Sequence, residues 1–190
     1  CALPILNNGF LWLLKVQPST TKFTINFTNC GATGGVGPSI EQVLGAYSGI
    51  PAIADYLYPA AWLGRQGYQA WVVPFTGFYR ITCAGASGGN MQHTSSSGGY
   101  TNFGGKGARV VAEYYLEIGE ILIITVGQSG SGGTYVTSGF FAGGGGGFSS
   151  VHLNGGDGTG KGLLLCAGGG PGAPGGTAIA VNASNASIPA

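Results

Sequence analysis

The sequence predicts an all-β protein, and two features of the chain indicate this fold class. Short apolar runs alternate with turn residues over most of the length, and no stretch repeats apolar residues with the period of a long helix. Glycine makes up 40 of the 190 residues, and its clusters follow the ends of the expected strands. Glycine does not recur at every third position, so a collagen helix is excluded.

The first expected strand, Phe10–Val16, is almost continuously apolar. Its sequence is FLWLLKV, and the polar, proline-containing segment Gln17–Lys22 follows it. Exposing such an arm is costly, because burying one large apolar side chain is worth about 1.5–3 kcal/mol. We therefore expect residues 1–22 to form an N-terminal arm and joint, and residues 23–190 to form a glycine-rich domain.

The rest of the chain is expected to form short strands and one helix. Phe23–Thr28 alternates apolar and polar residues, which is typical of a half-buried strand. Ser39–Tyr47 is expected to form a short helix, and the aromatic residues after it an ordered loop. Further strands are expected at residues 70–75, 78–85, 108–118, 120–126, 162–168 and 177–184.

Three glycine clusters share one order of residues: strand, cysteine, small residue, glycines. They follow Cys30, Cys83 and Cys166. Without a Cβ atom, extended glycine backbones can approach closely, and their buried polar groups must then bond to one another. We interpret the clusters as ordered polyproline II-like chains in a backbone lattice. Flexible linkers between strands are the alternative.

Charge is scarce and scattered. Seven basic and six acidic residues give a net charge of +1, and only 7% of the residues are charged. The basic residues form no stripe, so a nucleic-acid partner is not expected. The apolar runs are far shorter than the roughly 20 residues of a membrane span. A surface with so few charges is poorly protected against association, which suggests that it meets protein or carries sugar.

Cysteines and glycosylation sequons favour an extracellular or cell-surface location. The four cysteines (Cys1, Cys30, Cys83, Cys166) are an even number, compatible with two disulfides, and lack the close spacing of a zinc site. Acceptor sequons for N-linked glycans begin at Asn26, Asn182 and Asn185. A start at Cys1 fits a processed chain, with a lipid-modified first cysteine of a bacterial lipoprotein as the alternative.

Several blocks resemble the glycine-rich extracellular domain of the anaplastic lymphoma kinase and leukocyte tyrosine kinase receptors. They are FTINFTNCGATGGVGPS (23–39), QAWVVPFTGFYRITCAGASGG (69–89), GGKGARVVAEYYLEIGEILIITVGQSG (104–130), GGGGGFSSV (143–151) and LLLCAGGGPG (163–172). The resemblance covers residues 23–175. It implies a TNF-like, jelly-roll-type β-sandwich joined to bundled polyglycine II-like helices, an extracellular location and no catalysis.

The chain also departs from that family. The family's cysteine partner for Cys30 would stand near Val43, and Cys83 and Cys166 stand where the family has Gly or Ala. The comparison therefore implies a Cys83–Cys166 pair, leaving Cys1 for Cys30 within or between chains. The apolar arm has no counterpart in the family. The matched blocks include no kinase, so receptor signalling is not carried over.

Enzyme-like motifs in the sequence are explained better by glycine content. Residues 85–89 match the GxSxG pattern, with His93, His152 and Asp157 as conceivable partners for Ser87, but no helix follows the serine. Residues 155–162 approach a phosphate-binding loop, but Gly162 replaces the magnesium-binding hydroxyl. We expect no catalytic residue, cofactor or metal.

Two non-enzymatic functions remain. In the first, the protein is a structural subunit whose arm enters a neighbour's sheet and builds a head-to-tail homopolymer. The arm's assembly residues would be Phe10, Leu11, Trp12, Leu13, Leu14 and Val16, and folding back onto its own sheet is the alternative. In the second, it is an adhesin or ligand-binding module for a glycan or a protein receptor. Its candidate binding aromatics are Tyr56, Tyr58, Trp62 and Tyr68.

Overall fold

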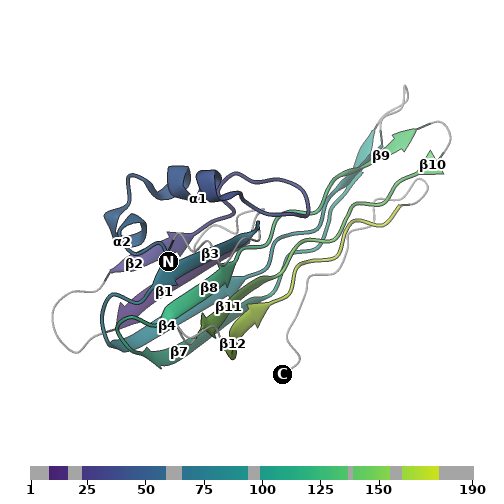
Figure 1. The fold of residues 1–190 in the computed structure, drawn as a ribbon. Helices are drawn as coiled ribbons and strands as arrows, with labels where there is room; N and C mark the ends of the chain where they lie inside the picture. Colours follow the sequence, from purple (N-terminus) through teal and green to yellow (C-terminus); the bar gives the residue numbers. More distant parts are fainter. Residues whose placement is uncertain are drawn as a thin grey trace.

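A computed structural model describes residues 9–16, 23–58, 66–93, 99–136, 139–154 and 160–175. Two four-stranded antiparallel sheets pack face to face as a β-sandwich (Figure 1). The first sheet has the order β2 (Thr24–Phe27), β1 (Phe10–Val16), β4 (Gly77–Ala84), β7 (Arg109–Leu116). The second has the order β12 (Gly160–Ala167), β11 (Ser149–Asn154), β8 (Ile121–Thr125), β3 (Tyr68–Val72). The predicted all-β sandwich is thereby confirmed.

The core lies between the two sheets and is centred on Trp71. Its ring makes edge-to-face contacts with Phe27, Tyr56 and Tyr79, at centroid distances of 6.2, 6.2 and 6.5 Å. Alternate residues of β4 contribute Tyr79, Ile81 and Cys83, all fully buried. Period-two burial of this kind follows from the strand geometry, because successive side chains point to opposite faces.

Two short helices cover the side of the sandwich at which β2 and β3 lie, α1 (Ile40–Tyr47) and α2 (Pro51–Ala54) (Figure 1). Ser39 caps α1: its hydroxyl accepts from the Gln42 N–H, and the Gln42 side chain accepts from the Ser39 N–H. Tyr47 and Ile53 bury against the core. The predicted helix is therefore confirmed, and α2 was not predicted.

Five glycine-rich passages leave one end of the sandwich side by side, and we call them the stalk (Figure 1). They comprise residues 85–90, 103–108, 127–132, 141–148 and 168–175. Residues 85–90 are central and bond to all four others. Each set of bonds recurs after three residues. The N–H groups of residues 85 and 88 donate to 103–108, and those of 86 and 89 to 141–148. The carbonyls of residues 86 and 89 accept from 168–175, and those of 87 and 90 accept from 127–133.

A period of three is that of polyproline II, which supports our interpretation of the stalk as a backbone lattice. At the far end of the stalk lies a small sheet of order β10 (Gly139–Phe140), β9 (Gly133–Val136), β5 (Met91–His93), β6 (Tyr100–Asn102). In it, β5 and β9 pair in parallel. The expected strand at residues 177–184 and the joint 17–22 lie outside the described residues.

Candidate functional site

The apolar arm occupies a slot in the middle of the first sheet. β1 pairs antiparallel with β2 from Leu11↔Phe27 to Leu14↔Thr24, and with β4 from Phe10↔Ala84 to Val16↔Phe78. Leu11 is fully buried in the core. The backbone of the other predicted assembly residues (Phe10, Trp12, Leu13, Leu14, Val16) follows the same register. In this single chain β1 is therefore an integral strand rather than a projecting arm, and the boundary at residue 23 stays a prediction.

At the stalk end of β1, Gly9 is packed closely against the neighbouring backbone. The Gly9 N–H donates to the Gly127 carbonyl at 2.9 Å. A Cβ atom on Gly9 would lie 2.6 Å from Ser149 Oγ and 2.9 Å from the Ala84 carbonyl oxygen, so only glycine fits. Ser149 Oγ itself donates to the Ala84 carbonyl at 2.7 Å and accepts from the Gly127 N–H at 3.0 Å. The strand is thus fixed where the sandwich meets the stalk.

At the opposite end of the sandwich, which we call the base, four large apolar side chains are exposed. Phe75, Phe78, Tyr115 and Ile118 are 49, 54, 57 and 67% exposed, and we call them the base patch. Phe78 and Tyr115 pack edge to face at 5.2 Å, and the Ile118 N–H donates to Thr76 Oγ1 at 3.0 Å. Phe78 is also the β4 residue opposite Val16. The patch therefore lies where β1 leaves the sheet.

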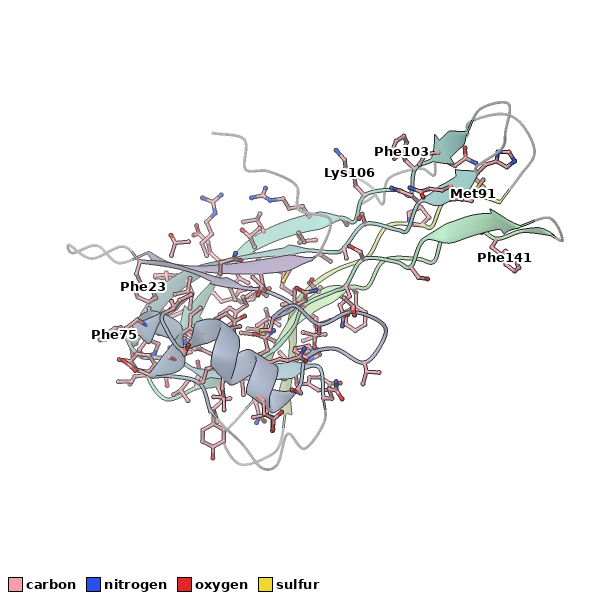
Figure 2. The ribbon with its side chains drawn as sticks, turned by 90° about the horizontal axis from the view of Figure 1, so that it is seen from above. Phe23, Phe75, Met91, Phe103, Lys106 and Phe141 are labelled. Carbon is pink, nitrogen blue, oxygen red and sulfur yellow. The ribbon has the colours of Figure 1, made fainter. Side chains whose placement is uncertain are left out.

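Sequence analysis missed the base patch. Phe78 and Tyr115 stand at exposed positions of alternating strands, and this alternation was the signal that could have identified them. Phe75 and Ile118 belong to turns, and only the fold brings them beside the strands. Figure 2 shows Phe75 together with Phe23, the residue that precedes β2, at the end of the molecule away from the stalk.

The described cysteines are free thiols in the structure. Cys83 lies in the core, whereas Cys166 is exposed on β12, and the structure joins them by no disulfide. Burial, with a smaller contribution from nearby Cys166, raises the pKa of Cys83 to about 12. Cys30 is half-buried with φ 51°, and burial raises the pKa of its thiol although Tyr47 and Thr28 hydrogen-bond to it. Cys1 lies outside the described residues, and the implied pairings stay predictions.

The hydroxyl of Tyr47 connects the loop that contains Cys30 with strand β3 of the second sheet. Its hydroxyl donates to Gln69 Oε1 at 2.8 Å and accepts from the Thr28 N–H at 2.8 Å. Gln69 Nε2 in turn donates to the Thr28 carbonyl at 2.6 Å. Burial raises the pKa of Tyr47, so it stays a neutral donor. This buried cluster holds the α1 side of the sandwich on the core.

The predicted binding aromatics do not form one cluster. Tyr56 packs on the core through Trp71, Tyr58 and Tyr68 are 43 and 40% exposed, and Trp62 lies outside the described residues. Tyr68 lines a groove of about 840 Å³ between the loop of residues 33–37 and the stalk. The described residues that line this groove carry no charge. One of them, Gln128, has a buried Oε1 that accepts no hydrogen bond.

The remaining predicted site residues are dispersed. Asn26 is a half-buried residue of β2 whose Oδ1 is buried without a hydrogen bond, while Asn182 and Asn185 lie outside the described residues. Ser87 belongs to the stalk, His93 to β5 and His152 to β11, while Asp157 lies outside the described residues. Within the described ranges, no three metal-ligating residues gather, and no helix is long and apolar enough to cross a membrane.

Comparison with known proteins gives several matches, one of which is a receptor of modest identity. The chain is 34% identical to the mouse (Mus musculus) leukocyte tyrosine kinase receptor over 114 residues. The match covers 60% of this chain and 12% of the receptor's length. No protein-family model matches. The similarity supports the resemblance stated from the sequence, and the activity of the whole receptor does not follow from so small a part of it.

Proposed function

We propose that the protein is an extracellular structural subunit that polymerises by strand exchange, each copy inserting its β1 into the first sheet of the next. The observation that carries the proposal is the position of β1 between β2 and β4. Without β1, both neighbouring strands have open edges and the core lacks Leu11. Any identical strand supplied by another copy fills the same slot with the same pairings.

The sequence around β1 favours exchange. Only the segment 17–23 joins β1 to the rest of the chain in the C-terminal direction, and it contains Pro18. A short hinge of this kind makes swapping an identical element between copies a low-cost route to assembly. The low charge of the chain, 13 formal charges in 190 residues, offers little repulsion between copies.

Removing the arm alone does not test this proposal, because a central strand is needed for folding in either case. A chain lacking residues 1–16 can accept an arm but cannot donate one, so it should cap growing fibres. We expect electron microscopy of the intact chain to show fibres of uniform width, whose mean length falls as arm-deleted chain is added. The matched control is arm-deleted chain already loaded with a synthetic peptide of residues 9–16, which should leave the length unchanged. Intact chain that stays monomeric at high concentration would refute polymerisation.

A second candidate function is binding of a neutral ligand such as a glycan in the groove beside Tyr68. An exposed aromatic ring, an uncharged lining and the unsatisfied Gln128 Oε1 favour a ligand that carries hydroxyl groups. Binding on a glycan array that is lost in Tyr68→Ala and retained in Tyr115→Ala would support it. Absence of binding across a broad array would refute it.

A further inference from the structure

The direction of β1 restricts how two copies can meet. β1 runs from Gly9, at the stalk, to Val16, which is opposite Phe78 at the base. β2 runs antiparallel to it and begins at Thr24, whose partner is Leu14. The segment that joins β1 to β2 therefore leaves one strand and enters the other at the base, in the donor and in the acceptor alike.

The length of the joint limits how far apart the bases of the two copies can lie. From Val16 to Thr24 there are eight steps along the chain, which span at most about 29 Å when fully extended. The eight residues of β4 rise about 26 Å, and the six stalk residues that follow add about 19 Å. The far end of the stalk is thus about 45 Å from the base. An exchanged joint cannot place the donor's base beside the acceptor's tip.

We propose that the base patch is the second contact between successive copies, which meet base against base when β1 is exchanged. This inference rests on the proposed strand exchange. Its independent support is the position and chemistry of four side chains that are about half or more exposed: Phe75, Phe78, Tyr115 and Ile118. They lie at the end of the sandwich where the joint leaves one copy and enters the other. Apolar area of this kind on a protein surface is typical of a protein–protein contact.

Base-to-base contact determines the architecture of the assembly. Two copies that exchange arms reciprocally form a closed dimer, whereas copies that donate to one neighbour and accept from another form an open filament. In either assembly the joint keeps neighbouring bases within about 29 Å of each other. Phe103 and Phe141, 55 and 56% exposed near the far end of the stalk, lie beyond that reach (Figure 2).

Photo-crosslinking tests the contact. The photoreactive analogue benzoylphenylalanine is introduced in place of Phe75 in one variant and of Phe103 in another, because the two phenylalanines are similarly exposed. After assembly and irradiation, we expect covalent oligomers from position 75, with the crosslinked peptides mapping to residues 75–78 or 115–120 of another copy. Position 103 should give monomer. Fibres that crosslink from position 103 and not from 75 would overturn the base-to-base contact while leaving strand exchange intact.

A charge variant gives a second readout that does not depend on crosslinking. Ile118→Glu should raise the concentration needed for assembly at least tenfold, because it places a carboxylate in the apolar contact. Leu163→Glu, at a 56% exposed position of β12 outside the base patch, is the matched control and should change it less than twofold. Equal effects of the two variants would overturn the inference, and absence of assembly in the unmodified chain would refute the proposed function as well.

Discussion

Close backbone packing in the stalk predicts a sharp difference between two adjacent glycines. A Cβ atom on Gly146 would lie 2.2 Å from the Ala86 carbonyl oxygen, whereas one on Gly145 would meet nothing nearer than 3.9 Å. Neither residue has the positive φ that disfavours alanine. The variants Gly146→Ala and Gly145→Ala therefore make the same chemical change and differ only in the space that the methyl group finds.

The cost of Gly146→Ala follows from the separation it forces. An ordinary contact to the Ala86 oxygen is at least 3.4 Å, so the two passages must move apart by about 1.2 Å. That movement breaks the bonds from the Ala86 N–H to Gly147 and from the Gly89 N–H to Gly144, now 2.9 and 2.8 Å. Overpacking costs about 1–3 kcal/mol and each lost bond about 0.5–1.5 kcal/mol, so we expect a loss of about 2–6 kcal/mol.

Thermal and urea unfolding measure the difference. For a chain of this length each kcal/mol lowers the melting temperature by about 2–4 °C, so Gly146→Ala should unfold about 4–24 °C below the unmodified chain. Gly145→Ala should unfold at the same temperature or slightly above it, because alanine restricts the unfolded chain. If the two variants melt within about 2 °C of each other, the close-packed backbone lattice is refuted.

Three further outcomes follow from buried groups. In urea unfolding, Leu11→Ala should lower the free energy of unfolding by about 2–5 kcal/mol, and Leu163→Ala by less than about 0.5 kcal/mol, because of the two only Leu11 is buried. Equal effects of the two variants would contradict a core position for β1. Tyr47→Phe should cost about 1–3 kcal/mol by leaving buried partners unsatisfied, while Tyr115→Phe should be neutral. The free energy of unfolding should fall as pH rises from about 9 toward 12, because the pKa of the Cys83 thiol is raised to about 12 in the folded chain and the thiol ionises at lower pH in the unfolded chain. The Cys83→Ala variant should show a smaller fall over the same pH range, and an equal fall would contradict this cause.

Local patterns in the sequence predicted much of the fold. The alternation in Phe23–Thr28, the short helix expected at Ser39–Tyr47 and the apolar runs of β4, β7 and β8 all led to the correct element. Each of these signals acts over a few residues, so it can be interpreted without knowing which strands are neighbours. The same is true of the glycine clusters at the strand ends.

The candidate site was predicted only in part. The apolar character of residues 10–16 indicated a strand, and β1 is the second strand of four in the first sheet. Its separation from the domain and its role in assembly stay predictions. The base patch was missed, because the turns that carry Phe75 and Ile118 lie 42 residues apart at the Thr76–Ile118 hydrogen bond. The predicted binding aromatics form no single cluster, because Tyr56 packs on the core against Trp71.

The sequence by itself determined the type of the main elements (α1, β1 to β4, β7, β8 and β12), the scarcity of charge and the position of the glycine clusters at the ends of strands. Only the tertiary structure decided that β1 lies between β2 and β4, that residues 85–90 are the centre of the stalk, and that four apolar side chains gather at the base. The physical reason is that strand pairing and backbone packing join segments far apart in the chain. Local propensity and period carry no information on which of those segments meet.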